Sequence, residues 1–311
     1  MSGFYRVIFI ILLFVLIFNG VAHSSDITQP KTAIFISQPI RPYLIAAEGL
    51  REELVRSIRA EIEEFDLGGL EEKDYDILTG DLIKNKFDVF IAIGPAAAEF
   101  VWSSFPSPDV KKLYTMVLDH EGIQVPLQSA CGITLRIPID TQLQLISLGL
   151  PGVKRIGIPY DPVYNAEIVK QAVKSSSDLG LSIIPLAISS KREIPPTLNK
   201  NWSKLDALLL IPDRTIISES IIQYIIKEAL LNRVAVVGYN KFFYESGAAL
   251  AFPLDYREIG EQTGRMAKKI LSGKRCEKKL PGFHAWINER VIRKLGITPV
   301  KKYQSPLEAG P

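Results

Sequence analysis

The sequence is poor in the residues that metal, redox and covalent chemistry require. Among its 311 residues there are two cysteines and three histidines, and the histidines are scattered along the chain. The motifs of zinc proteases, thiol oxidoreductases, serine hydrolases and P-loop nucleotide-binding proteins are missing. The sequence therefore gives no support to these classes of enzyme, and we expect neither a cofactor nor a metal.

The sequence also lacks an excess of either charge. It contains 37 Lys and Arg residues and 34 Asp and Glu residues, which gives a net charge of +3. The basic residues near the C-terminal end do not form a basic surface interspersed with aromatic residues, of the kind that binds nucleic acid. We therefore expect no nucleic-acid partner.

The N-terminal segment differs from the rest of the chain. Residues 1–25 contain one Arg, an uncharged apolar run from Val7 to Phe18 and a stretch of small residues, which is the pattern of a secretion signal. The run is short for a membrane span, which needs roughly 20 apolar residues. We expect an exported, periplasmic protein with a signal peptide at 1–25, and an uncleaved membrane anchor is the alternative.

The two cysteines, Cys131 and Cys276, have no metal-ligand spacing. Cysteines of an exported chain can pair, but a disulfide also requires Cα atoms within roughly 6 Å, and sequence does not give that distance. We expect two free, partly buried thiols, and a disulfide is the alternative.

Two series of short apolar segments run through the chain, offset by about 120 residues, a spacing typical of one domain. Short runs that are almost wholly apolar indicate strands buried on both faces of a parallel sheet, and the segments between them have helical periodicity. The first series is 31–37, 74–80, 86–94 and 111–119, and the second is 154–160, 181–187, 204–212 and 233–239. This alternation predicts an α/β protein with two Rossmann-like lobes.

The segments 132–140 and 247–255 have similar sequences, because each leads from a predicted strand through Pro and Asp into a predicted helix. Two such similar segments are expected where a chain crosses between two lobes at equivalent places. The predicted boundaries are 26–138 for lobe 1, with 254–283 returning to it, and 139–253 for lobe 2, with 284–300 as a candidate return. Residues 301–311 are rich in Pro, Gly and Ser, and we expect a disordered tail there.

Polar and aromatic residues follow the predicted strands, where ligands sit in open parallel sheets. The N–H groups of Ala96 and Ala97, at a helix start, are candidates for binding a carboxylate. Asp213 is a candidate partner for a ligand ammonium group, and its alternatives are pairing with Arg214 or capping the helix near Ser218. Asn165 is expected to N-cap its helix. The full set of candidate ligand-binding residues is Gln38, Tyr43, Gly94, Pro95, Ala96, Ala97, Asp119, Tyr160, Tyr164, Asn165, Asp213, Arg214 and Tyr239.

Four longer stretches carry a resemblance to a known family: "LPGVKRIGIPYDPVYNAEIV", "KLDALLLIPDRTI", "YESGAALAFPLDYREIGEQTGRMAKKILSGK" and "INERVIRKLGI". With them the chain resembles the substrate-binding proteins of ABC transporters related to the tryptophan- and tyrosine-binding group, with the type I periplasmic binding protein fold. The resemblance implies two lobes joined by three crossings that close on a small ligand, typically an amino acid.

The resemblance also assigns residues. It implies that Gly94 to Ala97 receive the ligand carboxylate, that Tyr160 and Asn165 belong to the facing loop, and that Asp213 faces an amino group. The chain departs from the family pattern at Gly94-Pro95, at Arg214 and at Tyr239-Asn240, so the amino-acid ligand is in question.

The expected function is capture of a small ligand, an amino acid or a related carboxylate, by a monomer that serves an ABC permease. The alternative is the same cleft reporting to a membrane sensor kinase. An exported enzyme that uses Asp119, His120 or Asp213 is the least favoured hypothesis, because adjacent residues in a strand usually point apart. We therefore expect a binding protein and not an enzyme.

Overall fold

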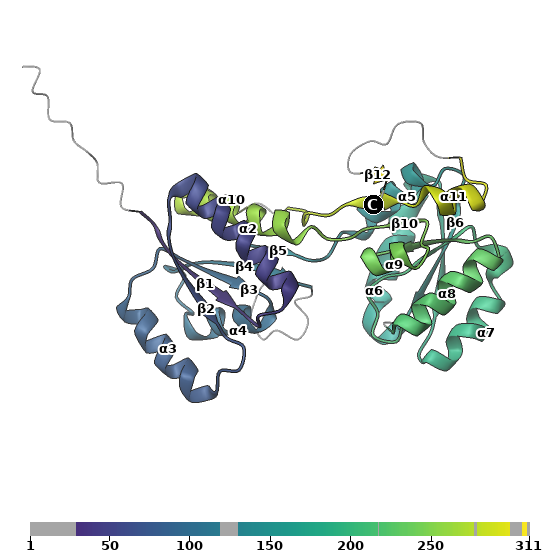
Figure 1. The fold of residues 1–311 in the computed structure, drawn as a ribbon. Coiled ribbons are helices and arrows are strands. Elements are labelled where there is room, and N and C mark those ends of the chain that lie inside the picture. The colour runs from purple at the N-terminus through teal and green to yellow at the C-terminus, as the bar shows by residue number, and fades with distance from the viewer. Residues whose placement is uncertain (1–28, 119–129, 217, 277–278, 299–306, 310–311) are drawn as a thin grey trace, which may run out of the picture.

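The computed structural model describes residues 29–118, 130–216, 218–276, 279–298 and 307–309, which form two α/β lobes (Figure 1). The first lobe contains a five-stranded sheet in the order β2-β1-β3-β4-β5, and the second a seven-stranded sheet in the order β12-β11-β10-β9-β8-β6-β7. Neighbouring strands are parallel, except that β10 and β11 are antiparallel. The structure confirms the predicted α/β fold with two Rossmann-like lobes.

The sheet of the first lobe has helices on both faces. Its strands are β1 (Lys31–Ile36), β2 (Glu61–Asp66), β3 (Val89–Ile93), β4 (Lys111–Val117) and β5 (Gly132–Thr134), and its helices are α2 (Arg41–Ile58), α3 (Glu72–Lys84), α4 (Pro95–Ser104) and α10 (Tyr256–Leu271). Alternate residues of β1 enter different cores, since Ile34 packs in the core with α2 and α10 whereas Phe35 packs in the core with α4. Burial on both faces explains why the central strands are continuous apolar runs.

The second lobe repeats this plan. Its strands are β6 (Arg155–Tyr160), β7 (Ser182–Ala187), β8 (Ala207–Leu209), β9 (Ala235–Gly238), β10 (Leu250–Ala251), β11 (Ala285–Ile287) and β12 (Leu307–Ala309). Its longer helices are α5 (Ile139–Gly149), α6 (Pro162–Ser176) and α8 (Glu219–Leu231), and the short helices α7 (Ile194–Asn199), α9 (Lys241–Glu245) and α11 (Glu289–Lys294) complete its layers. One core lies under α5 and α6 and the other under α7 and α8.

One predicted strand is wrong. Residues 74–80 lie inside α3, and the second strand of the first lobe is β2 at the edge of its sheet, beside β1. The Glu71 side chain and the Asp74 side chain each accept a hydrogen bond from the other's backbone N–H, and this capping box starts the helix. The strand was missed because its sequence, "EIEEFD", is acidic, as suits an edge strand that is paired on one side only.

Three connections join the lobes: residues 135–138 from β5 to α5, residues 252–255 from β10 to α10, and residues 272–284 from α10 to β11. Figure 1 shows them running together along one side of the molecule, so that the first and second lobes are linked only there within the described chain. The C-terminal β12 pairs in parallel with β11 at the edge of the second sheet. This differs from the disordered tail expected from composition, because pairing with β11 orders residues 307–309.

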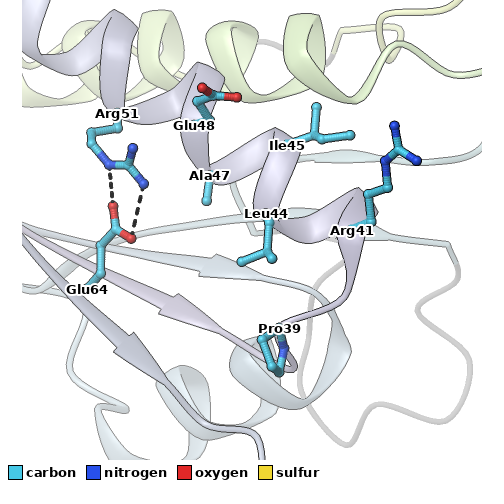
Figure 2. Close-up of a pocket in the computed structure, with 8 residues that line it drawn as sticks. All are labelled: Pro39, Arg41, Leu44, Ile45, Ala47, Glu48, Arg51 and Glu64. Atoms are coloured by element: carbon cyan, nitrogen blue, oxygen red, sulfur yellow. Dashed lines mark hydrogen bonds and ion pairs between the residues drawn. The ribbon is translucent and has the colours of Figure 1, made fainter.

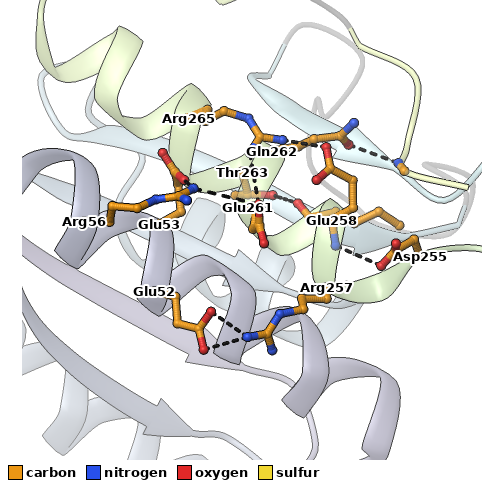
Figure 3. Close-up of polar contacts among 12 residues, drawn as sticks. Glu52, Glu53, Arg56, Asp255, Arg257, Glu258, Glu261, Gln262, Thr263 and Arg265 are labelled. Carbon is orange, nitrogen blue, oxygen red and sulfur yellow. Dashed lines mark hydrogen bonds and ion pairs between the residues drawn. The ribbon is translucent and has the colours of Figure 1, made fainter.

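Helix α10 packs closely along α2, which anchors the second and third connections to the first lobe. A side chain at Gly260 would overlap the backbone of α2 at Ala46, and a Cβ added at Gly264 would lie 2.7 Å from Glu53 Cγ. Ion pairs reinforce this contact, as Figure 3 shows: Arg257 binds Glu52 at 2.6 Å across the two helices. The pair of helices therefore forms one rigid unit of the first lobe.

The structure contains a disulfide between Cys131 and Cys276, with Cα atoms 5.6 Å apart. The expectation of two free thiols is therefore wrong. Cys131 precedes β5 and Cys276 follows α10, and the fold brings these points together because α10 packs beside β4 and β5. The disulfide fastens the start of the third connection to the first lobe.

Candidate ligand site between the lobes

In the first lobe, the loop after β3 is shaped by a glycine. Gly94 has a φ of +90° and precedes the first turn of α4, and a Cβ on this residue would lie 2.7 Å from Ser37 Oγ and 2.7 Å from the Tyr43 ring. The N–H of Ala97 donates to Ser37 Oγ at 2.8 Å. Ser37, Tyr43, Gly94 and Ala97 thus form one packed cluster at the C-terminal ends of β1 and β3.

This cluster changes the predicted role of the helix start. The Ala97 N–H, expected to be available for a ligand carboxylate, is already bonded to Ser37, a residue that the sequence analysis did not select. Pro95 and Ala96 are exposed beside it. The N–H of Ala96 is one of the first-turn donors for which a helix offers no internal acceptor.

In the second lobe, two buried carboxylates join the loops after β6 and β8. Asp213 is 3% exposed and accepts hydrogen bonds from the Asp161 N–H, from Asn165 Nδ2 and from the Thr215 N–H, each at 2.8 Å. Asp161 is 6% exposed and accepts from the Val163 N–H at 2.9 Å and from Thr215 Oγ1 at 2.9 Å. Every carboxylate oxygen of the pair has a donor, so we call this network the carboxylate lock.

The lock corrects the expectation for Asn165 and excludes both alternatives given for Asp213. Asp161, and not Asn165, N-caps α6, and Asn165 is buried within the helix with its amide on Asp213 and on the Pro212 carbonyl. Asp213 neither pairs with Arg214 nor caps α8, and its carboxylate is enclosed by the lock. The polar residues after β6 therefore include a structural element that holds two loops together.

The remaining polar residues of these loops lie at the surface. Arg214 is exposed and lies over the ring of Tyr164, with its guanidinium carbon 5.1 Å from the ring centroid. Tyr164 is 52% exposed, and Tyr160 is half-buried at the end of β6. Arg214 and Tyr164 form a cation–π pair on the surface of the second lobe, and we call the surface that these two residues form the rim.

A pocket of about 480 Å³ lies at the junction of the lobes and the connections. Its walls come from the end of β4 and the start of α10 in the first lobe, from the first and second connections, and from α5, α6 and the ends of β8 and β9 in the second lobe. The lining residues are Leu118, Thr134, Leu135, Arg136, Ile137, Pro138, Ile139, Gln142, Ile168, Gln171, Ile211, Pro212, Tyr239, Asn240, Phe252, Leu254 and Tyr256. The pocket is mainly apolar, with one charged side chain, Arg136, among these residues.

The pocket contains few of the residues selected from the sequence. Tyr239 lines it, whereas the other selected residues of the described chain lie in the loop cluster of the first lobe, in the carboxylate lock or on the rim. Gln38 is exposed after β1, and Asp119 and His120 lie outside the described residues. Sequence reasoning did not select the pocket residues Arg136, Gln142, Gln171, Asn240 and Tyr256. Arg136 lies in the segment 132–140 and Tyr256 directly follows the segment 247–255, so the similarity of these two segments was the sequence feature that could have indicated them.

Three tyrosines keep their protons at neutral pH: Tyr239 and Tyr256, which line the pocket, and Tyr43 of the first-lobe cluster. Burial raises the pKa of Tyr43 and of Tyr256, and burial together with the negative charge of Asp213 raises the pKa of Tyr239. Their hydroxyl groups are therefore hydrogen-bond donors as well as acceptors. Tyr239 also packs on Phe243 with ring centroids 4.6 Å apart, which fixes its position.

A second hollow of about 500 Å³ lies wholly on the first lobe, between α2 and the edge strand β2 (Figure 2). Arg51 binds Glu64 across it, with Nε and Oε1 2.7 Å apart. None of its lining residues comes from the second lobe or the connections. It is an open groove, and lobe movement would not enclose a ligand in it.

Neither a metal centre nor a membrane-spanning helix is found in the described parts of the chain. No group of three or more His, Cys, Asp or Glu side chains there is arranged to hold a metal ion. None of the helices there combines the length and the apolar character that crossing a membrane needs. The predicted signal segment, 1–25, lies outside the described residues.

Comparison with known proteins gives a curated relative and several similar solved structures. A curated tyrosine-binding protein of Clostridioides difficile is 22% identical over 209 residues, which cover 63% of this chain and 58% of that protein. The ligand-free, open structure of a substrate-binding protein with adhesive properties from Clostridium difficile is 20% identical, with a TM-score of 0.71 over 90% of this chain and 99% of that one. A Streptococcus pneumonia ABC domain in complex with L-Trp is also 20% identical, with a TM-score of 0.54 over 88% and 97%.

The family model for ABC transporter substrate-binding proteins matches residues 47–302, which is most of the chain. This range begins within α2 in the first lobe and includes all three connections and the described strands of both sheets other than β1 and β12. The match includes the four stretches on which the resemblance was based. The chain belongs to the ABC transporter substrate-binding protein family, whose members bind solutes and are not enzymes.

Proposed function

We propose that this protein is exported, captures a small ligand at the junction of its lobes and delivers it to an ABC permease. The ligand class is an amino acid or a related carboxylate. The observation that carries the proposal is the 480 Å³ pocket, which is walled by both lobes and by the connections between them. A site in this position changes shape when the lobes move, so ligand binding and closure are coupled.

The size and lining of the pocket support a small organic ligand. Ligand pockets commonly have volumes of about 300–1,000 Å³ and are mainly apolar with a few polar groups that fix orientation. Here Arg136, Gln142 and Tyr239 supply such groups among aliphatic and aromatic walls. The pocket therefore suits a ligand with an apolar body and a polar or charged end.

The arrangement of the lobes supports an open form. At the same 20% identity, the structure is more similar to the ligand-free, open relative than to the L-Trp complex, with TM-scores of 0.71 and 0.54. Closure would bring the first-lobe cluster around Gly94 towards the rim that carries Tyr164 and Arg214. Residues of both loops would then approach the ligand without lining the open pocket.

The test is to strip the purified protein of bound small molecules and to measure its thermal unfolding with a panel of amino acids, carboxylates, sugars and nucleosides. A ligand that binds the native state adds RT ln(1 + [L]/Kd), about 2.7 kcal/mol at a concentration of 100 Kd. One compound class should raise the melting temperature in proportion to the logarithm of its concentration. The absence of any shift, and of any co-purified small molecule by mass spectrometry, would contradict the proposal.

A further inference from the structure

The edge strand β2 of the first lobe has an open side. It stands last in its sheet, and β1 is its one strand neighbour in the described chain. The N–H groups of Glu61 and Leu67 donate to carbonyls on the β1 side. Because successive residues of a strand direct their backbone groups to alternate sides, the N–H and C=O groups of Ile62, Glu64 and Asp66 point away from β1. Such a row of backbone groups is a template for a further strand.

A groove borders β2 on each face of the sheet. The hollow of about 500 Å³ between α2 and β2 lies on the face where α2 packs (Figure 2). A second groove, of about 380 Å³, lies between β2 and α3, and its residues Phe65 and Leu78 pack on the core of the other face. Glu64 lines both grooves. A strand added to the open side of β2 would therefore direct its side chains alternately towards the two grooves.

The groove beside α3 is both acidic and apolar. Asp74, Ile77, Leu78 and Asp81 line it at helical spacing, and Asp66 lines it from β2. Ile77 is 65% exposed, and no Lys or Arg is among the described lining residues. Lys and Arg side chains lay an aliphatic stem on apolar surface and carry their charge at the end. They are the side chains that this groove fits.

The negative charge extends over the whole of this edge. Residues 61–84, from the start of β2 to the end of α3, contain nine Asp and Glu residues and two Lys residues, in a chain whose net charge is +3. Two copies of β2 side by side would bring these acids together, and like charges on paired strands are destabilising. The charge therefore favours a basic partner over a second copy of this chain.

The groove beside α2 has no net charge. Arg51 and Glu64 bind each other across it through two hydrogen bonds of 2.7 and 3.3 Å, as Figure 2 shows, and Arg41 and Glu48 add one charge of each sign. Its other lining residues are aliphatic, and Leu44 among them is 46% exposed. An apolar side chain fits this groove, because no charge of the groove is left without its opposite.

We propose that the open side of β2 is a docking site for an extended segment of a partner protein, which adds as a strand to the first sheet and has Lys or Arg at alternate positions with apolar residues between them. The basic side chains enter the groove beside α3, and the apolar side chains enter the groove beside α2. Backbone hydrogen bonds to β2 supply affinity, and the two grooves supply sequence preference. None of the groove residues lines the 480 Å³ pocket, so the docking site is separate from the candidate ligand site.

Three synthetic peptides of equal length test the proposal by isothermal titration of the purified protein. In acetyl-KVKVKVK-amide Lys alternates with Val, in the second peptide Glu replaces Lys, and in the third the residues of the first are rearranged into blocks, VVVKKKK. The alternating basic peptide should bind, with an affinity that falls as ionic strength rises. The acidic peptide should not bind, and the block peptide should bind at least about fivefold more weakly, since it cannot place apolar and basic side chains in separate grooves. Equal binding of the alternating and block peptides would overturn the proposal.

Backbone methylation of the peptide tests strand addition itself. The N–H groups of the Lys residues lie on one edge of the extended peptide and those of the Val residues on the other. Methylation of one of these two sets should abolish binding, whereas methylation of the other set should leave it. Retained binding by both methylated peptides would show that no backbone hydrogen bonds to β2 form, and would overturn the proposal.

Two pairs of variants locate the site on the protein. Glu64→Pro removes an outward N–H and keeps the hydrogen bonds to β1, a position where edge strands accept Pro; Glu64→Ala is its control, because it removes the same side chain and keeps the N–H. The Pro variant should bind the alternating peptide about tenfold more weakly than the Ala variant. Asp81→Lys should weaken binding about fivefold, and Asp76→Lys, which makes the same charge change on an exposed residue of α3 outside the groove, is its control.

Unchanged melting temperatures establish that the variants are folded. Equal losses in Asp81→Lys and Asp76→Lys, or equal binding by both Glu64 variants, would refute the site. Sedimentation velocity tests the other occupant, a second copy: a dimer that Glu64→Pro dissociates would overturn the proposal, and we expect a monomer. If the peptides fail to bind while the stripped protein binds a small ligand, this inference is wrong and the proposed function stands.

Discussion

Replacement of Asp213 gives the sharpest test of the structure, because it separates a lock that holds two loops from a ligand contact. The carboxylate is 3% exposed and accepts three hydrogen bonds of 2.8 Å, two of them from buried residues. Asp213→Ala leaves all three donors without their acceptor. An unsatisfied buried group costs about 1–3 kcal/mol, so we expect a loss of about 3–5 kcal/mol in the free energy of unfolding of the second lobe.

Asp213→Asn gives a graded version of the same change. Its single carbonyl oxygen can remain on Asp161 and Asn165, and its NH₂ group then faces the Thr215 N–H, so that one hydrogen bond is lost and two donors meet. The expected loss is about 1–3 kcal/mol. With an m value of about 2 kcal/mol/M, a loss of 2 kcal/mol lowers the urea midpoint by about 1 M.

The measurement is urea unfolding followed by circular dichroism and by tryptophan fluorescence, to which Trp202, buried in the second lobe, contributes together with Trp102 and Trp286. Asp178→Asn is the matched control, since Asp178 is exposed on the same lobe and its change should stay within about 0.5 kcal/mol. If Asp213→Ala were as stable as the wild type while it lost ligand binding, Asp213 would be a ligand contact and the reasoning about the lock would be refuted.

Two further predictions concern stability. Reduction of the Cys131–Cys276 disulfide, or its removal in the double serine variant, should lower the free energy of unfolding by about 2–5 kcal/mol, because the bridged residues are 145 positions apart. Thermal unfolding with and without reductant measures this loss, and an equal effect of reductant on the double variant would contradict the prediction. Burial alone would raise the pKa of Asp206, but hydrogen bonds from the Arg155 side chain and from the N–H groups of Arg155 and Lys154 lower it overall. Asp206 therefore contributes stability above its unfolded pKa of about 3.9 that is lost as pH falls through the lower folded pKa, and Asp206→Asn should flatten this acid limb in unfolding measured between pH 5 and 2.

The central strands could be predicted because their residues are buried on both faces. The continuous apolar runs around Val89–Ile93 and Ala235–Gly238 need no tertiary information to be recognised as buried strands. The edge strand β2 could not be recognised in this way. It pairs on one side only, its sequence is acidic, and only the position of β1 beside it makes "EIEEFD" a strand.

The position of the candidate pocket agrees with the sequence analysis better than its lining residues do. Sequence reasoning placed the ligand at the C-terminal ends of the strands, and the pocket is walled by the ends of β8 and β9. It did not find Arg136, Gln142 or Tyr256, because these residues come from the connections and from helices that meet at the hinge. Residue type and local spacing carry no signal for a position that is defined by the junction of two lobes.

The sequence by itself determined the two α/β lobes, the two similar segments that connect them and the family, because periodicity and short motifs follow from local burial and local backbone geometry. Only the tertiary structure decided that Asp213 and Asp161 are enclosed by hydrogen bonds within the second lobe. Asp213 follows an apolar strand as a ligand-binding acid would, yet donors from the loop after β6, from α6 and from the loop after β8 enclose it. The same packing brought Cys131 to Cys276 across 145 residues of chain, since distances between segments that are remote in sequence are set by how the sheets and helices pack.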